Sequence, residues 1–336
     1  MARYYTRACN FYYGNISKNL VKDKKSLPLN GNKEISFDQI ELISRNSKKK
    51  IKINKLKNLP KTLKKQVIQD LKYITSKKKN FANLNFNKSP NIMGILNLTP
   101  DSFSDGGKFN SKNNGIIHAK QMFKSGANII DVGGESTRPG SKNVSLNNEW
   151  KRIQNVIKNF KKKYPKIFLS VDTRKSDIMV KAIENRVNLI NDVSGFDHDK
   201  DSLKKIKRYN VWKVLHHMQG TPNTMQINPN YKNVLFDIYD FFEGKINNDF
   251  SDFKNKNIIL DPGIGFGKNL KHNLMLMNKI SLFHSLGFPL LIGTSRKRFI
   301  NHISGNFDTK ERLGGTLASI LYTLLQGVQI FRVHNV

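Results

Sequence analysis

Cysteine is almost absent from this 336-residue chain, because Cys9 is the only one. A single cysteine cannot form a disulfide within the chain, which fits a reducing compartment, and we expect a cytoplasmic protein. Long hydrophobic runs are absent as well. No uninterrupted apolar stretch approaches the ~18 residues that span a bilayer, and the N-terminus has no apolar segment of the signal-peptide type. The sequence therefore predicts no membrane association.

Acidic residues are scarce, with 25 Asp and Glu against 58 Lys and Arg and a net charge of +33. Such a balance suggests a nucleic-acid partner, but the excess is spread along the chain. Residues 1–90 hold 22 basic and 5 acidic residues, and residues 91–336 hold 36 and 20. The excess is mostly lysine in a sequence rich in Asn and Ile, which is typical of a genome composition bias. We expect no nucleic-acid partner, although the positive field favours a small anionic substrate.

A change in composition near residues 87–90 divides the chain into two predicted parts. Residues 1–88 form a basic N-terminal region of unknown role, and residues 89–336 form the second domain. The first part predicts a small α+β region with short strands near 40–43 and 51–53 and an amphipathic helix over 60–73. The apolar face of that helix is predicted to hold Leu63, Val67, Ile68 and Leu71. No chemical motif occurs in this region, which favours a structural or interaction role.

Apolar runs alternate with amphipathic segments throughout residues 89–336. The runs predict strands near residues 92–96, 128–132, 167–171, 188–191, 211–215, 257–260, 289–292 and 328–333. The amphipathic segments predict helices near residues 115–125, 147–163, 175–186, 200–209, 232–249, 271–286 and 309–326. Continuous apolar strands are typical of parallel sheets, and eight of them with intervening helices favour a (β/α)8 barrel over an open doubly wound sheet. The eighth strand ends the chain, so the predicted α/β barrel lacks its last helix.

Polar residues gather where the predicted strands end. The segments that show this are NIMGILNLTPDSFSDGG (91–107), IIDVGGESTRPGS (129–141), FLSVDTRKS (168–176), IILDPGIGFGKN (258–269) and LLIGTSRKRF (290–299), with RVHNV closing the chain. In a (β/α)8 barrel the carboxyl ends of all the strands meet at one face, and active sites are built there. The sequence therefore predicts an active site at this face.

Four of these polar residues form a set that suits a flat heterocycle. Asp172, Asn191 and Asp261 end three strands, and Lys297 follows a fourth. Buried charges are costly unless they are paired, so strand-end charges near solvent favour a functional role. A ligand with adjacent N–H donors and a carbonyl matches two carboxylates, an amide and an ammonium. A 2-amino-4-oxo-pteridine has such an edge. The alternative is a buried ion-pair network.

A second set favours an anion. Arg332 and His334 alternate along the last strand and so point to the same face, and Asn97 ends the first strand, which is the neighbour of the last in a closed barrel. The neutral oxygen of Asn97 suits Mg2+, with phosphate oxygens and waters completing the shell. His216 and His217 suggest a metal pair, but adjacent strand residues point to opposite faces and so do not favour one shared metal.

Two loops complete the predicted site. Asp131 precedes the loop that carries Thr137 and Arg138, where a guanidinium between hydroxyls and glycines suits a carboxylate or another anion. We expect Asp131 to tie loop amides rather than to transfer protons. GIGFGK lacks the GxGxxG spacing of dinucleotide sites, so it predicts a tight loop that places Phe266 against a flat ligand.

Seven motifs in this order and spacing resemble those of the dihydropteroate synthases. They are NIMGILNLTPDSFSDGG, IDVGGESTRPGS, SVDTRK, INDVSGF, HHMQGTP, LDPGIGFGK and GTSRKRF, and the resemblance covers residues ~91 to 336. It implies a TIM-barrel transferase of folate biosynthesis that joins 6-hydroxymethyl-7,8-dihydropterin pyrophosphate to 4-aminobenzoate, releasing pyrophosphate and 7,8-dihydropteroate. It also implies Mg2+ as cofactor and a homodimer.

The resemblance assigns roles to individual residues. It implies that the pterin is held by Asp172, Asn191, Met218, Asp261, Phe266 and Lys297, and the pyrophosphate and its Mg2+ by Asn97, Arg332 and His334. It implies that the aminobenzoate pocket is shaped by Phe103, Thr137, Arg138, Pro139 and Arg298. The implied catalytic residues are Asp131, Asp261 and Lys297, of which the two carboxylates support positive charge on the pterin after pyrophosphate leaves.

This chain departs from the family pattern in RVHNV, where the family usually has RVHDV, and in Arg298, where relatives often have Ser. Two alternatives stay open. One is a methyltetrahydrofolate-dependent methyltransferase, which keeps the pterin carboxylates but needs no pyrophosphate set. The other is a non-catalytic barrel that binds polyanions through the lysine-rich N-terminal region.

Overall fold

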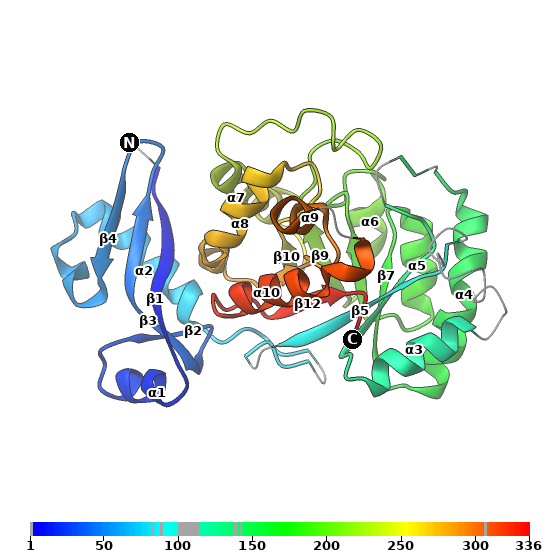
Figure 1. The fold of residues 1–336 in the computed structure, drawn as a ribbon, viewed down its shortest axis with the longest axis horizontal. Coiled ribbons are helices and arrows are strands. Elements are labelled where there is room, and N and C mark those ends of the chain that lie inside the picture. The colour runs from blue at the N-terminus through cyan, green and yellow to red at the C-terminus, as the bar shows by residue number, and fades with distance from the viewer. Residues whose placement is uncertain are drawn as a thin grey trace.

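The computed structural model describes residues 3–81, 84–87, 90–99, 114–137, 140–141, 143–305 and 308–336. Two sheets organise the chain, and they lie next to each other in Figure 1. A four-stranded antiparallel sheet lies at the left of that view, within the N-terminal region, and an eight-stranded parallel sheet surrounded by helices forms the larger part. The described residues contain no helix with the length and apolar content needed to cross a membrane.

The parallel sheet confirms the predicted (β/α)8 barrel. Its strands are β5 (Asn91–Asn97), β6 (Ile129–Gly133), β7 (Phe168–Asp172), β8 (Leu189–Asp192), β9 (Trp212–His216), β10 (Ile258–Asp261), β11 (Leu291–Ile292) and β12 (Ile330–Val333). Neighbours follow the order β10-β9-β8-β7-β6-β5-β12-β11. A single bridge between Leu260 and Leu290 brings the two ends of this order together. The strand order also places β5 next to β12, so the first and last strands of the barrel are neighbours, as predicted.

Helices alternate with these strands. They are α3 (Asn114–Lys124), α4 (Leu146–Lys163), α5 (Ser176–Glu184), α6 (Ser202–Ile206), α7 (Val234–Asn248), α8 (Leu270–Asn278), α9 (Arg298–Ser304) and α10 (Leu313–Leu324), with 3-10 turns η3 (Ile280–Leu286) and η4 (Thr309–Arg312). The helix predicted over 271–286 is two elements, α8 and η3. Ser281 of η3 donates to the carbonyl of Ala8 at 3.0 Å, a long-range contact that no local pattern shows.

Inward-facing side chains separate the barrel interior into an apolar end and a polar end. Ile129, Phe168, Leu189, Trp212 and Ile330 belong to one buried cluster near the strand starts. Leu84 and Phe86, from the segment that precedes β5, join this cluster and close that end. Because side chains alternate along a strand, the inward positions two or four residues later lie at the carboxyl ends, where the polar residues stand.

The N-terminal region is a sheet covered by helices. Its elements are β1 (Tyr5–Tyr13), α1 (Gly14–Lys22), β2 (Leu27–Leu29), β3 (Asn32–Ile43), β4 (Lys48–Lys52), η1 (Ile53–Asn58) and α2 (Lys61–Thr75). The predicted helix is present, but Ile68 is 55% exposed, so its assignment to the apolar face is wrong. Val67, Leu71 and Ile74 are the residues that α2 buries. The buried face is rotated because the sheet, absent from the local pattern, sets the contact.

Strand β1 attaches this region to the barrel. The ring of Tyr5 stacks on Phe236 of α7 with centroids 4.3 Å apart, and its hydroxyl donates to Asp240 at 2.9 Å. Glu41 of β3 is buried and accepts from Arg7 at 2.7 Å and from Lys279, which follows α8, at 2.9 Å. Stacked aromatics and buried charge-assisted hydrogen bonds hold the region in one position on the barrel.

Candidate active site

The polar residues predicted from strand ends do converge at the carboxyl end of the barrel. The residues that strands bring there are Asn97 (β5), Asp131 (β6), Asp172 (β7), Asn191 (β8), His216 (β9), Asp261 (β10) and Arg332 (β12). Lys297 joins them from the N-cap of α9. The sequence places these residues here because each follows an apolar strand at an inward position.

Arg332 lies at the centre of an ion-pair network. Its Nε donates to Asp131 Oδ2 at 2.7 Å, and its Nη2 donates to Asp172 Oδ2 at 2.8 Å. Asn191 Nδ2 donates to the same Asp131 oxygen at 3.0 Å. The pKa of Arg332 is raised, because the two carboxylates outweigh the effect of burial. The predicted pterin set and the predicted anion set are thus in direct contact and can serve one ligand.

The carboxyl groups of this network are buried. Burial disfavours their ionised form unless hydrogen-bond donors, such as those of a ligand, surround them. Burial raises the pKa of Asp172 although Arg332 opposes this, and burial raises the pKa of Asp261 to about 6. Among the described residues Asp131 Oδ1 has no hydrogen-bond partner. A buried acceptor without a donor is costly, so this oxygen favours a ligand that offers an N–H group.

Lys297 stands beside an aromatic ring. Its Nζ is 4.0 Å from the ring centroid of Phe266, and that ring meets His216 edge-on at 4.6 Å. Burial and the charge of Arg332 lower the pKa of Lys297 to about 8. Gly263 begins the loop that carries Phe266, with φ +70, and a Cβ there would overlap the carbonyl of His217. The glycine-rich loop is therefore a tight structural turn, as the sequence predicts.

Asn97 and His334 flank the network. An added Cβ at Gly133 would lie 3.3 Å from Asn97 Oδ1 and 3.5 Å from Asp172 Cβ, so the side chains of Asn97 and Asp172 both neighbour this glycine. His334 Nδ1 contacts Ser295 Oγ at 3.0 Å, and the His334 backbone N–H donates to the same oxygen at 3.2 Å. Ser295, which the sequence did not single out, thus fixes the imidazole. Its place beside Lys297 in GTSRKRF was the available signal.

Other predicted residues are placed less centrally. Met218 and Thr137 are half-buried, and Arg298 is exposed on the first turn of α9. Phe103, Arg138 and Pro139 lie outside the described residues, so their roles stay predictions. His216 Nδ1 contacts the Val193 carbonyl at 2.8 Å inside the barrel, whereas the ring of His217 packs on Phe241. The two histidines point apart, as strand alternation predicts.

A buried network behind the site also escaped the sequence reasoning. Glu135 accepts from the Val144 backbone N–H at 2.9 Å and from Arg174 at 2.9 Å, and so joins both ends of the loop after β6 to the loop after β7. Glu149 accepts from Lys175 at 2.5 Å. Both Glu135 and Arg174 belong to strand-end motifs, so their position in those motifs was the available signal.

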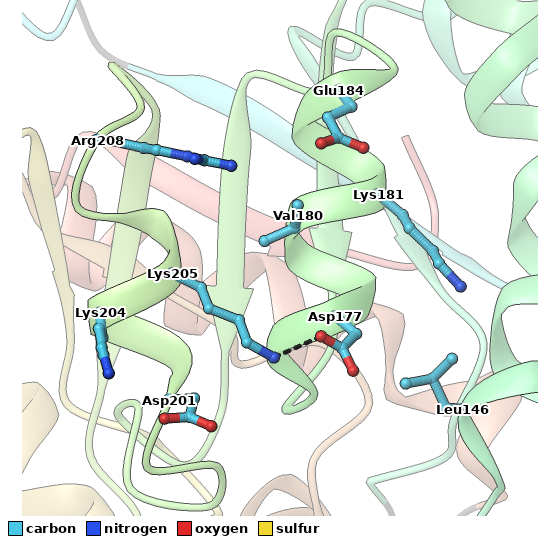
Figure 2. A pocket seen from close by; sticks show the side chains of 9 residues that line it. All are labelled: Leu146, Asp177, Val180, Lys181, Glu184, Asp201, Lys204, Lys205 and Arg208. Carbon is cyan, nitrogen blue, oxygen red and sulfur yellow. Dashed lines mark hydrogen bonds and ion pairs between the residues drawn. The ribbon is translucent and has the colours of Figure 1, made fainter.

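A surface cleft lies elsewhere, between α5 and α6. Figure 2 shows this cleft of about 700 Å³, with Lys205 paired to Asp177 across it. Its lining residues are Leu146, Asp177, Val180, Lys181, Glu184, Asp201, Lys204, Lys205 and Arg208. They come from helices and helix ends on the outer wall of the barrel and mix both signs of charge. This cleft is therefore not the candidate active site.

The chain is similar to known proteins over most of the barrel. Residues 93–334 match the family described as pterin binding enzyme. The chain is 45% identical over 247 residues to a dihydropteroate synthase of Clostridium beijerinckii, covering 73% of this chain and 88% of that protein.

Two solved structures are similar as well. One is a dihydropteroate synthase of Clostridium difficile in the presence of pteroic acid, with TM-score 0.67 and 41% identity over 74% of this chain and 91% of that one. The other is the Xanthomonas albilineans dihydropteroate synthase with 4-aminobenzoic acid, with TM-score 0.69 and 34% identity over 75% and 89%. The described site residues, from Asn97 to His334, all fall within the matched range.

Proposed function

The chain belongs to the dihydropteroate synthases, which are pterin-binding transferases of folate biosynthesis, and we propose how its residues carry out their reaction. That reaction joins 6-hydroxymethyl-7,8-dihydropterin pyrophosphate to 4-aminobenzoate and releases pyrophosphate and 7,8-dihydropteroate. The observation that supports the residue assignments most is the contact of Arg332 with both Asp131 and Asp172. It brings a cation suited to a diphosphate within reach of carboxylates suited to pterin N–H groups.

The pterin is held by groups that complement its edge. Asp172 and Asp261 accept from its N–H donors, Asn191 adds an amide, and the ammonium of Lys297 donates to its carbonyl. These carboxyl groups are buried, and the pKa of Asp261 is raised to about 6. We therefore expect N–H groups of the pterin, rather than water, to be their hydrogen-bond partners. Met218 and Phe266 pack against its flat faces.

The diphosphate is held by Arg332, His334 and Asn97. Arg332 supplies a planar fork of donors that suits phosphate oxygens. The described residues contain no group of three or more His, Cys, Asp and Glu side chains that could hold a metal ion. A single neutral oxygen from Asn97 nevertheless fits Mg2+ that arrives with a diphosphate, because Mg2+ keeps several waters and takes few protein ligands. The ion would neutralise charge on the leaving pyrophosphate.

Little proton transfer is needed from the protein. The C–O bond between the exocyclic CH2 and the pyrophosphate breaks with its electron pair on oxygen, where Arg332 and His334 stabilise the charge. The pterin ring spreads the positive charge left on carbon, which the carboxylates of Asp131 and Asp261 support. The amine of 4-aminobenzoate then attacks this carbon, a C–N bond forms, and the amine proton passes to the released pyrophosphate. Lys297 keeps the ring oriented throughout.

The family resemblance assigns the aminobenzoate pocket to Phe103, Thr137, Arg138, Pro139 and Arg298. Of these, Thr137 and Arg298 are described, and the roles of Phe103, Arg138 and Pro139 stay predictions. Arg298 supplies positive charge near the carboxylate of the substrate. Water must be excluded during the reaction, because it would otherwise capture the cation.

The chain forms a homodimer through α10 and works in the cytoplasm. Leu313, Leu317, Leu321 and Leu325 recur every fourth residue along one face of this helix, and each is between 38% and 57% exposed. Leucines at this spacing make a continuous apolar stripe, and such stripes on a surface helix mark protein interfaces. The stripe suits a second copy of the same helix.

The single buried cysteine, Cys9, suits a reducing compartment.

A pyrophosphate-release assay with both substrates tests the proposed function. Release should require 4-aminobenzoate and the pterin pyrophosphate together, should yield 7,8-dihydropteroate in equal amount, and should depend on Mg2+. Asn97→Ala should raise the Mg2+ concentration needed for half-maximal rate. Release that needs no 4-aminobenzoate, or an Asn97→Ala enzyme with unchanged Mg2+ dependence, would contradict the corresponding assignment.

A further inference from the structure

A buried lysine joins the two loops that follow β9 and β10. Lys268 is 3% exposed, and its Nζ donates to the carbonyls of Phe266 at 2.8 Å and His217 at 3.3 Å. It also lies 3.1 Å from His217 Nδ1. An ammonium has three donors and no acceptor, so this ring nitrogen accepts and all three donors are satisfied. No role in the proposed reaction uses Lys268.

The contacts of Lys268 belong to a larger set that fixes the glycine-rich loop. Gln226 Nε2 donates to the carbonyl of Gly265 at 2.9 Å, and the Tyr231 hydroxyl donates to that of Gly267 at 2.8 Å. With the Lys268 bond to Phe266, three consecutive carbonyls each accept from a side chain. Two of these donors come from the loop after β9. The two loops are therefore held as one unit.

This arrangement leaves the ring of Phe266 facing into the site. Lys297 Nζ lies 4.0 Å from its centroid, which is close for a cation–π contact, and His216 meets the ring at an interplanar angle of 85°. A shift of the Phe266 backbone would move the ring and with it the preferred position of the Lys297 ammonium. The hydrogen bond from Lys268 to the Phe266 carbonyl therefore affects the position of Lys297 through one intervening residue, Phe266.

Burying the charged side chain of Lys268 costs free energy, which favours a role for this residue beyond filling space. Burial lowers the pKa of Lys268 to about 7, with Asp261 opposing the change and Lys297 adding to it. Methionine would fill similar volume without the cost of desolvating a charge. The three acceptors around Nζ favour the ammonium form against this cost of burial.

We propose that Lys268 is a positioning residue that sets the place of the Lys297 ammonium by fixing Phe266. The consequence for pterin binding rests on the proposed function, whereas the effect on Lys297 does not. The test is Lys268→Met in the full chain. Lys213→Met is the matched control, because Lys213 is also fully buried, on β9, and its Nζ donates to the nearby Val211 carbonyl at 2.9 Å and lies 4.8 Å from the ring centroid of Phe253.

Two measurements read the effect. Carbon-13 NMR of ε-labelled lysine reports the ring-current shift that Phe266 imposes on Lys297, and Phe266→Leu defines the position of that signal without the ring. In Lys268→Met the signal should move toward the Phe266→Leu position, and in Lys213→Met it should stay. Calorimetry should show the Kd for free pterin rising about tenfold in Lys268→Met, with the Kd for inorganic pyrophosphate unchanged.

Tyr231→Phe provides a milder variant that removes one loop-to-loop hydrogen bond and should move the Lys297 signal in the same direction by less. An unmoved Lys297 signal in both variants overturns the proposal, and a moved signal with wild-type pterin affinity overturns its consequence for pterin binding. Loss of pterin and pyrophosphate binding to the same degree also overturns it, because that is general destabilisation. A wild-type chain that binds no pterin, with a signal that still responds to Lys268→Met, refutes the proposed function and leaves the positioning of Lys297 intact.

Discussion

Asparagine in place of Asp172 would keep the shape of the side chain and remove its charge. Asp172 is buried at the end of β7, where its Oδ2 accepts from Arg332 at 2.8 Å. We expect little loss of stability. Burial raises the pKa of this carboxyl group in the folded state, so its ionised form destabilises the fold and neutralising it removes that cost. Arg332 keeps its bond to Asp131 at 2.7 Å.

The substitution should weaken pterin binding much more than it lowers the stability of the fold. A carboxylate accepts from two adjacent N–H donors, whereas an asparagine offers one acceptor and turns an NH2 group toward the other donor. One charge-assisted hydrogen bond is lost, at about 1.5–3 kcal/mol, and one buried donor is left unsatisfied, at about 1–3 kcal/mol. Together these costs come to about 2.5–6 kcal/mol, which is roughly two to four orders of magnitude in Kd.

Calorimetry with free pterin measures this loss, and thermal unfolding followed by circular dichroism measures stability. Asp192→Asn is the matched control, because Asp192 ends the next strand, is fully buried, and has a pKa that burial raises to about 6, yet it accepts from the backbone N–H of Ser194 at 2.8 Å. The control should bind pterin normally. Wild-type pterin affinity in Asp172→Asn, or an equal loss in Asp192→Asn, would refute the reasoning.

Three further changes test other parts of the site and surface. Arg332→Ala should weaken binding of the pterin pyrophosphate about 10- to 100-fold more than binding of free pterin, because only the former loses a charge-assisted contact to phosphate; equal losses in calorimetry would contradict this. Pterin affinity should fall as pH rises above about 8, since the lowered pKa of Lys297 removes its proton there, and Lys297→Arg should keep its own affinity constant to pH 9. Leu317→Glu should give monomers in light scattering after size exclusion, whereas the same change at exposed Ile227 should leave the dimer, and a dimeric Leu317→Glu protein would argue against the α10 interface.

Much of the barrel was predictable because its strands have a simple pattern. Each predicted strand overlaps an observed one, since buried parallel strands are continuous apolar runs whatever lies around them. The helix over 271–286 and the short helix α9 were not predicted correctly. Both depend on distant partners, and the 3-10 turn η3 contacts β1 through Ser281. In the N-terminal region the same limit applies to Ile68, whose exposure is set by the sheet beneath α2.

The candidate active site likewise has some features that the sequence predicted and others that it did not. Convergence of Asp172, Asn191 and Asp261 followed from the position of each at a strand end, because parallel strands bring their carboxyl ends to one face. The pairing of Arg332 with two of the site's carboxylates did not follow, since it depends on how far a guanidinium reaches across the barrel. The role of Lys268 was hidden for the same reason, although it stands in a predicted motif.

By itself the sequence determined which residues are strands, which side chains point inward, and which chemical groups stand at the strand ends. These properties are local, because alternation and apolar runs depend on neighbours within a few residues. Only the tertiary structure decided that Arg332 contacts Asp131, 201 positions away, and that Tyr5 attaches the N-terminal region to α7. Such contacts depend on barrel closure and on the burial of charge, which are set by the whole chain at once.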